Sequence, residues 1–247
     1  MALYPWKRFW AGYGGPMTLS PEGFLADPEI QPFLENVFAF EQISGLGPLI
    51  LMGEPAIGKS TAVEAVCREA REILTHPDIA VWKDLRKLLP WDLRVEFLAD
   101  PEIQRWMSSK VGILHLFVDS LDEMLRVDGG IGTRLVNLIS GLDLGRLNLH
   151  LVCRTADWPH SLDREIEDCF GVPPFKYELL LLRRCDIELA AEQEGIDPKA
   201  FVDEVSSRGV VGLATKPGTL AMWNAPGLTE APFLGFSRIL EEGVPAP

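Results

Sequence analysis

The sequence predicts an α/β fold, in which helices lie on both faces of a parallel sheet and a small helical subdomain follows. From about residue 45 to residue 158, apolar runs of strand length alternate with segments of helical periodicity. Two of these runs end in polar groups typical of the ligand-binding edge of such a sheet. Beyond Pro159 come another apolar run and then helical segments; these are Tyr177–Leu182, Cys185–Gln193, Pro198–Ser206 and Thr219–Trp223. We therefore expect an N-terminal arm at residues 1–42, an α/β core at 43–175 and a helical subdomain at 176–247.

The N-terminal arm is rich in aromatic residues and glycine up to residue 20. We interpret this part as an irregular segment whose rings pack on the core. The alternative is that Trp6–Trp10 binds a ligand or a partner, and we give it roughly half the prior probability of ring burial. Pro21, Pro28 and Pro32 keep any following helix short. One or two helical turns against the core are predicted from Phe33, Leu34, Val37, Phe38 and Phe40.

The first strand of the core leads into a phosphate-binding pattern. The apolar run Leu49–Met52 precedes a segment with every fixed position of G-x-x-x-x-G-K-[ST]. Its residues are Gly53, Glu54, Pro55, Ala56, Ile57, Gly58, Lys59, Ser60 and Thr61. The N–H groups of the loop, and the dipole of a helix predicted over Ser60–Leu74, favour a bound phosphate. We expect Lys59 to contact the β- and γ-phosphates and Ser60 to bind Mg²⁺.

The second strand, Ile79–Trp82, is followed by Asp84 and Arg86, which we interpret as a surface ion pair. Residues 92–109 predict one or two helices. The octapeptide Phe-Leu-Ala-Asp-Pro-Glu-Ile-Gln occurs twice, at Phe24–Gln31 and at Phe97–Gln104. In both copies the aspartate before proline predicts a helix N-cap, and the repetition itself suggests no function.

The third strand, Val111–Asp119, delivers acidic groups to the same edge of the sheet. Asp119 stands at its carboxyl end, in the Walker B position from which an aspartate holds Mg²⁺ next to Ser60. Glu123, four residues on, is placed to polarise the attacking water. Asp122 adds a third carboxylate, and three acids in one site favour a bound cation. His115 is interpreted as an ordinary strand residue.

A helix is predicted over residues 131–141, and the strand Leu147–Cys153 follows it. Arg154 comes directly after this strand. Its guanidinium is therefore expected on the ligand side of the sheet, where it can contact a γ-phosphate. Together the phosphate loop and these two polar strand ends predict one nucleotide site.

Composition and charge exclude several classes of protein. The 247 residues carry a formal net charge of −13, and from Thr155 onward acidic side chains strongly outnumber basic ones. This disfavours nucleic acid as a partner of that segment, because phosphate backbones are bound by Lys and Arg clusters. The four cysteines form no C-x-x-C pair, which argues against zinc and suits a reduced, cytoplasmic protein. No apolar run reaches the roughly 20 residues of a membrane helix, so we expect no membrane partner.

These motifs together resemble the ATPase module of NACHT-type STAND NTPases. Gly53–Thr61 is similar to their phosphate loop, which opens with Gly-Glu-Pro, and Leu116–Glu123 is similar to their Walker B segment. Leu149–Arg154 resembles their sensor 1 strand. Leu213–Leu220 resembles their helical-domain segment, in which a proline touches the base. The likeness spans about Ile43 to Leu240, and the opening Tyr4–Trp10 is similar to bacterial antiviral STAND ATPases.

The resemblance implies an AAA+/STAND-like signalling switch that uses ATP, ADP and Mg²⁺. Such proteins hold ADP in a closed monomer until a ligand opens them; they then bind ATP, self-associate and activate an effector. By this resemblance, phosphate and Mg²⁺ are bound by Lys59, Ser60 and Asp119. The other implied roles are hydrolysis for Glu123, γ-phosphate sensing for Arg154 and adenine packing for Pro217. Arg154 departs from the family pattern, because Thr-Ala-Asp follows it in place of a proline.

Three functions stay open at the level of sequence. A switch with slow hydrolysis is favoured, because the nucleotide motifs and a helical lid occur without the pattern of a substrate pocket. A solitary interaction module would bind nucleotide without turnover. A P-loop phosphotransferase would need an acceptor site, for which the late pair Arg183 and Arg184 is a poor basis. The ending Gly243–Pro247 resembles a cut end, so we expect either an ATPase fragment of a longer protein or a solitary minimal one.

Overall fold

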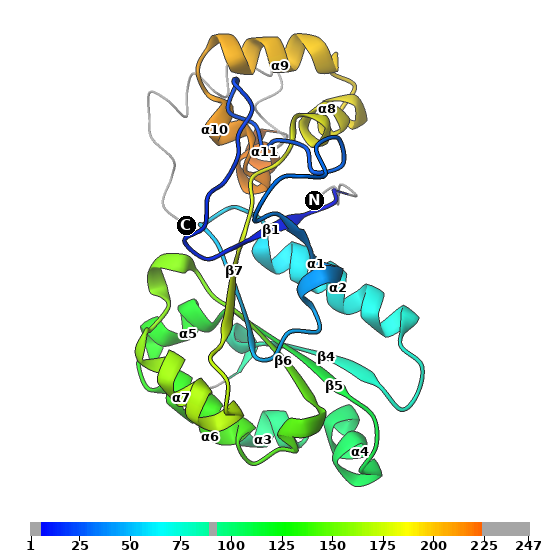
Figure 1. The fold of residues 1–247 in the computed structure, drawn as a ribbon, viewed down its shortest axis with the longest axis vertical. Coiled ribbons are helices and arrows are strands. Elements are labelled where there is room, and N and C mark those ends of the chain that lie inside the picture. Colours follow the sequence, from blue (N-terminus) through cyan, green and yellow to red (C-terminus); the bar gives the residue numbers. More distant parts are fainter. Residues whose placement is uncertain (1–5, 89–92, 224–247) are drawn as a thin grey trace.

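The computed structural model describes residues 6–88 and 93–223 (Figure 1). Its sheet has the strand order β2-β1-β7-β3-β6-β5-β4. Five of these strands run parallel: β3 (Leu49–Met52), β4 (Ile79–Asp84), β5 (Leu114–Asp119), β6 (Leu147–Val152) and β7 (Phe175–Leu179). β1 (Phe9–Gly12) pairs antiparallel with β7, and β2 (Phe38–Ala39) pairs antiparallel with β1. The predicted α/β class is confirmed.

Successive side chains of each strand point to opposite faces of the sheet, so the strands feed two cores. From β3, Ile50 and Met52 enter one core, and Leu49 and Leu51 enter the other. The first core lies under α3 (Leu93–Leu98), α4 (Pro101–Ser109), α5 (Leu121–Val127), α6 (Ile131–Ile139) and α7 (Ser161–Phe170). The second lies under α1 (Phe40–Ile43) and α2 (Lys59–Ile73). Helices therefore cover both faces, as the sequence predicts.

The helical subdomain forms the upper part of Figure 1. It consists of α8 (Arg184–Gln193), α9 (Pro198–Ser207), α10 (Val211–Ala214) and α11 (Pro217–Trp223). Its own core includes Ile187, Phe201 and Val205, and Phe24 of the N-terminal arm is fully buried in it. Asp197 caps α9 by accepting a hydrogen bond from the N–H of Ala200, with Pro198 at the first helical position. The predicted helices of this region are confirmed.

The N-terminal arm differs from its predicted structure. It is not wholly irregular, because residues 9–12 form β1, in which Trp10 lies opposite Leu179 and is 1% exposed. Of the predicted helical turns against the core, one is present as α1, whose Phe40 and Ile43 are buried. The segment before it is not helical, since Phe33 is 94% exposed and residues 38–39 form β2. Asn36 explains the difference: its φ of 60° is not helical, and its amide group bonds to the backbone of Gly12. Local polar contacts thus turn the chain toward the sheet.

Three further features complete the described fold. Strand β7 pairs with β3 and so belongs to the core sheet, which therefore extends to Leu179, four residues past the predicted end of the core at residue 175. The division into three domains stays a prediction. Short 3₁₀ segments lie at Leu85–Lys87, Leu144–Arg146 and Thr155–Asp157. None of the helices in the described ranges combines the length and the apolar character needed to cross a membrane.

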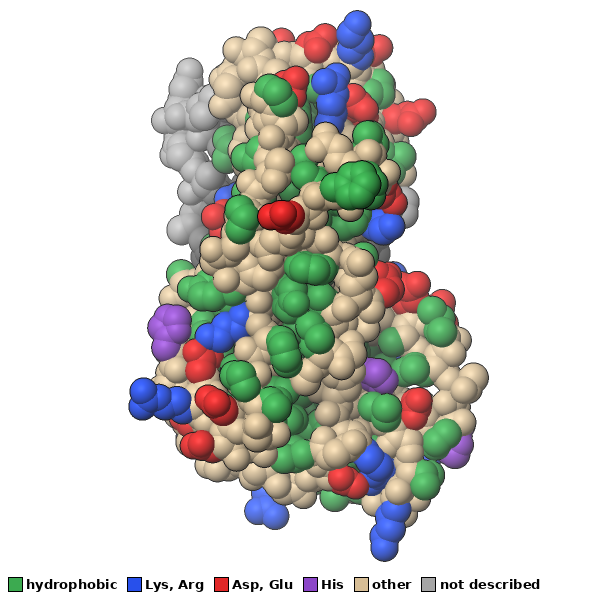
Figure 2. Space-filling view, viewed as in Figure 1, with side chains coloured by type: hydrophobic (Ala, Val, Ile, Leu, Met, Phe, Trp, Pro, Cys, Tyr) green, Lys and Arg blue, Asp and Glu red, His purple; other side chains and the backbone are tan. Residues whose placement is uncertain are grey.

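One face of the molecule combines a central group of apolar side chains with charged side chains around it (Figure 2). On the face shown in Figure 2, hydrophobic side chains gather in front of the region where β7 and β1 run, and most of the charged side chains lie around them. The exposed apolar residues of the arm and of β7 include Tyr13, Met17, Leu19 and Phe175.

Candidate functional site

The phosphate loop joins β3 to α2 and lies at the carboxyl end of the parallel strands. Gly58 ends the loop with φ 86°, a conformation that strongly favours glycine, and α2 begins at the next residue, Lys59. The loop borders a cavity of about 200 Å³. The cavity is lined by Glu54, Pro55, Ala56, Gly58, Lys59, Ser60, Thr61, Asp119, Ser120, Asp122, Glu123 and Arg154. The N-terminus of α2 and the side chains predicted to bind and hydrolyse the nucleotide therefore border the same cavity.

Strand order explains why residues that are distant in sequence meet here. β6 lies between β3 and β5, so the segment that follows β6 stands between the phosphate loop and the Walker B strand. Parallel strands end at the same edge, which brings Arg154 next to Asp119 and to the loop. The structure thus brings together all four residues predicted to be catalytic, Lys59, Asp119, Glu123 and Arg154.

Lys59 points back toward its own loop. Its Nζ donates to the carbonyl oxygens of Gly53 at 2.7 Å and of Glu54 at 3.0 Å. Burial lowers the pKa of Lys59, and the nearby Asp122 carboxylate opposes that shift. An ammonium held by two neutral carbonyls and partly removed from water is a strong binding group for an anion.

Asp119 provides the feature expected of a Mg²⁺ ligand. It is 2% exposed, and its Oδ2 is buried without a hydrogen-bond partner among the described residues. Burial raises the pKa of Asp119, although a hydrogen bond from the Ser60 hydroxyl opposes the rise. A hard cation takes carboxylate and hydroxyl oxygens as ligands, so the donor set of Asp119 and Ser60 fits Mg²⁺.

The other carboxylates of the site are held by arginines. Arg154 Nε lies 2.8 Å from Asp122 Oδ2, and Asp122 is buried. Arg86 binds both oxygens of Asp84, at 3.0 and 2.9 Å, and its Nη1 lies 4.0 Å from Glu123 Oε1. Burial favours neutral Asp84, but the hydrogen bonds from Arg86 outweigh it and lower the pKa of Asp84. The predicted ion pair of Asp84 and Arg86 is confirmed, although Asp84 is buried and the pair borders the site.

Three of the predicted nucleotide-binding residues do not line the cavity. Gly53 and Ile57 belong to the loop but are not part of the cavity lining, and Ile57 is 2% exposed and packs into the core under α1 and α2. Pro217 packs against the outer side of the loop, where its Cγ would be 3.2 Å from a Cβ placed on Gly58. Its predicted contact with adenine stays a prediction.

Sequence reasoning missed the groups that hold the loop from outside. Arg8 donates to the carbonyl of Ile57, the N–H of Gly218 donates to the carbonyl of Ala56, and Lys216 pairs with Glu54. No local pattern reports these contacts, because their partners are separated by about 50 to 160 residues and meet only after folding.

The structure resembles solved structures at low sequence identity. The Aeropyrum pernix ORC1 protein in complex with DNA gives a TM-score of 0.48 at 12% identity, covering 79% of this chain and 55% of the ORC1 chain. Domain III of the Thermotoga maritima replication initiation protein DnaA gives 0.47 at 14% identity, covering 89% and 98%. Saccharomyces cerevisiae RIF2 gives 0.41 at 10% identity, covering 82% and 79%. No protein-family model and no curated protein matches the sequence. The function is therefore argued from the residues of this chain.

Proposed function

We propose that this chain binds ATP or ADP with Mg²⁺ and hydrolyses ATP slowly, as the nucleotide module of a STAND-type signalling switch. The observation that carries the proposal is the convergence of a phosphate loop, a buried aspartate, a more exposed glutamate and an arginine on one cavity. These groups are those that phosphoryl transfer requires.

Each group has a separate task in this proposal. Lys59 supplies positive charge to the β- and γ-phosphates, and the N–H groups of the loop bind phosphate oxygens. Ser60 and Asp119 would hold Mg²⁺, which neutralises charge on those oxygens when it is bound. Glu123 orients and polarises the attacking water. Arg154 can exchange Asp122 for a γ-phosphate, because both are anionic acceptors for a guanidinium.

The switch part of the proposal is supported by a contact between the two parts of the molecule. The N–H of Gly218, in α11, donates to the carbonyl of Ala56 at 2.9 Å, so the helical subdomain touches the phosphate loop. Self-association with bound ATP, and a role in bacterial antiviral defence, rest on the sequence resemblance alone. Tyr4 and Pro5 of that resemblance, and its part beyond residue 223, lie outside the described residues.

The first experiment is to denature the purified protein and identify any released nucleotide by chromatography. Retained ADP supports an autoinhibited switch. An empty protein that turns over added ATP rapidly would contradict the switch and favour a metabolic P-loop enzyme. An empty protein that binds ATP without any turnover would favour the interaction module.

The phosphate-loop assignment is tested with Lys59→Ala. We expect tight binding of ATP and ADP to be lost, because the buried polyphosphate loses its main counter-charge. Isothermal titration calorimetry measures the affinity. Arg68→Ala is the matched control, since Arg68 is an exposed cation on the same helix and does not line the cavity. Unchanged affinity in Lys59→Ala would remove the loop from nucleotide binding.

A further inference from the structure

Two consecutive carbonyls of the phosphate loop are held from outside by segments distant in sequence. Arg8 Nη1 donates to the carbonyl of Ile57 at 3.0 Å, and the N–H of Gly218 donates to the carbonyl of Ala56 at 2.9 Å. Arg8 also donates through Nη2 to the carbonyl of Leu180 at 2.7 Å, directly after β7. One side chain of the N-terminal arm therefore connects the loop to the segment that leads into the helical subdomain.

The bond from Arg8 to Ile57 acts on the cavity side of the loop through peptide geometry. The carbonyl of Ile57 and the N–H of Gly58 belong to one peptide unit, which is trans. A trans peptide directs these two groups to opposite sides. Because Arg8 holds the carbonyl on the outer side, the N–H of Gly58 is directed toward the cavity that Gly58 lines.

The environment of Arg8 is unusual for an arginine. Its guanidinium is half-buried and forms no ion pair with the described carboxylates. Burial lowers the pKa of Arg8 to about 10, and the charge of Asp186 opposes the shift. Two backbone carbonyls therefore take the place of water around the guanidinium, and its positive charge lies next to a loop that is predicted to bind an anion.

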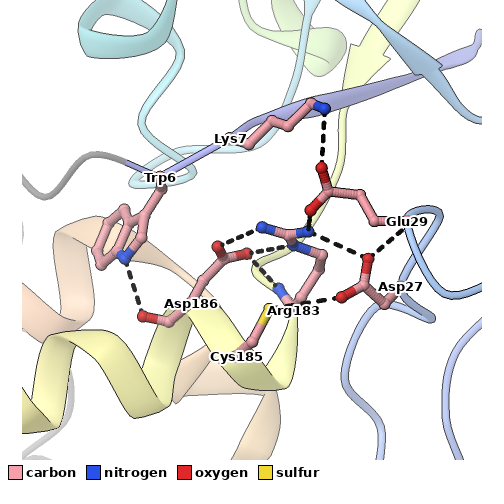
Figure 3. A network of polar contacts seen from close by, with 7 residues as sticks. All are labelled: Trp6, Lys7, Asp27, Glu29, Arg183, Cys185 and Asp186. Carbon is pink, nitrogen blue, oxygen red and sulfur yellow. Dashed lines mark hydrogen bonds and ion pairs between the residues drawn. The ribbon is translucent and has the colours of Figure 1, made fainter.

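The N-terminal arm next to Arg8 is anchored to the helical subdomain (Figure 3). Trp6 Nε1 donates to the carbonyl of Asp186, in α8, at 2.8 Å. At the centre of this network is Arg183, which is buried and binds Asp27, Glu29 and Asp186. These contacts fix the arm to α8, and so they fix the place from which Arg8 reaches the loop.

We infer that Arg8 is a positioning residue for phosphate binding, which orients the Ile57–Gly58 peptide and makes nucleotide affinity depend on the N-terminal arm. The inference rests on the proposed function. It assigns the Trp6–Trp10 cluster an intramolecular role in the nucleotide site, in addition to the burial of its rings.

The test compares Arg8→Gln and Arg8→Lys with Lys7→Gln in the full chain. Lys7 is the neighbouring cation, is exposed, and pairs within the arm without touching the loop. Calorimetry measures the affinity for MgATP and for inorganic tripolyphosphate. We expect Arg8→Gln to weaken both by roughly tenfold, the size of one hydrogen bond from a charged donor. Arg8→Lys keeps the charge and one bond, so its loss should be smaller, and Lys7→Gln should bind like the parent protein.

The two ligands separate a loop effect from a direct contact. Loss of affinity for ATP with unchanged affinity for tripolyphosphate would overturn the inference, because Arg8 would then contact the nucleoside. Parent-like affinity for both ligands in a folded Arg8→Gln protein would also overturn it. Circular dichroism melting checks the fold; if Arg8→Gln does not fold, parent-like affinities in Arg8→Lys overturn the inference and weakened ones support it. A parent protein that binds neither ligand would contradict the proposed function itself.

Discussion

The three carboxylates of the site have different surroundings, and these assign them different tasks. Asp119 is buried with an unpartnered oxygen, which suits a cation. Asp122 is buried and neutralised by Arg154. The Glu123 side chain is 43% exposed, and its nearest cation, Arg86, is 4.0 Å away. A residue that polarises water needs access to water, so we propose Glu123, and neither aspartate, as the base.

Glu123→Gln should therefore leave nucleotide binding intact and slow turnover by roughly 10²–10⁴-fold, the range of a positioned general base. A phosphate-release assay measures turnover and calorimetry measures affinity. Glu69→Gln, an exposed change on α2, is the control. A variant that hydrolyses ATP at the parent rate would exclude Glu123 from the mechanism.

His150 is an uncharged residue in the core. It is 0% exposed, and neither ring nitrogen has a hydrogen-bond partner among the described residues. Its ring stacks on Phe117 at 4.3 Å and on His115 at 6.4 Å. Burial, with a smaller contribution from His115, lowers the pKa of His150 to about 3. A histidine in an unfolded chain titrates near pH ~6.5. Below that pH the unfolded state binds a proton that the folded state excludes.

The free energy of unfolding should consequently fall as the pH drops from about 6.5 toward about 3, by at most ~1.4 kcal/mol per pH unit from this group. His150→Leu removes this contribution, so its stability relative to the parent should grow with acidity. Urea unfolding at pH 7, 6 and 5 measures the difference. If the two stabilities change in parallel with pH, His150 is not the source of the acid sensitivity.

Among the elements, the repeated octapeptide shows how flanking sequence decides a local structure. In the second copy Asp100 caps α4, and its carboxylate accepts from the N–H groups of Glu102 and Ile103. In the first copy Asp27 accepts from the N–H of Glu29, but only a turn forms. Pro32 follows directly after the first copy and cannot supply the N–H that would continue a helix. The predicted cap interaction is present in both copies, whereas a helix follows only the second.

The cap of α4 can be separated from its ion pair by two substitutions. Asp100 also lies 2.7 Å from Lys83, and both side chains are largely buried. Asp100→Asn keeps the capping oxygen and loses the charge, while Asp100→Ala loses both. We expect Asp100→Ala to be less stable than Asp100→Asn by ~1 kcal/mol in chemical unfolding. Equal stability of the two variants would show that the cap contributes nothing.

The helices and strands differ in how well the sequence predicts their presence and their bounds. The observed bounds of β3 and α2 lie within one residue of the predicted ones. An uninterrupted apolar run predicts β3, apolar residues at helical spacing predict α2, and the phosphate-loop motif marks the boundary between them. α5 and α7 were not predicted. In α7 the apolar residues Leu162 and Ile166 are spaced for a helix, but they lie among acidic residues and give a weak signal. Burial against the sheet stabilises that helix, and the sequence does not show the sheet.

On the scale of the whole molecule, the helical subdomain packs against the phosphate loop through a glycine. A Cβ on Gly218 would lie 2.8 Å from the Cβ of Ala56 and 3.0 Å from its carbonyl oxygen. Because the carbonyl belongs to the backbone of the loop, it cannot move aside without changing the loop. The close approach of the two parts therefore requires glycine at this position.

Gly218→Ala should loosen this contact and accelerate ADP release severalfold, with the fold retained, since overpacking costs ~1–3 kcal/mol. Stopped-flow release of a fluorescent ADP analogue, chased with excess ATP, measures the rate. Gly212→Ala is the matched control, because a Cβ at Gly212 would meet no atom of the described residues within 4 Å. Equal release rates in the two variants would contradict a role of the contact in nucleotide exchange.

The sequence by itself determined the α/β class, the phosphate loop with its strand and helix, and the acidic and basic strand ends. The class follows from the periodicity of apolar residues, and the loop follows from a motif whose residues are close together in the sequence. Local sequence is therefore enough to predict these features. Only the tertiary structure decided that β1 completes the sheet, that Phe24 fills the helical subdomain, and that Arg8 and Gly218 hold the loop. Each of these depends on contacts between segments far apart in the chain. Such contacts form where folding brings two surfaces together, and neither surface alone specifies its partner.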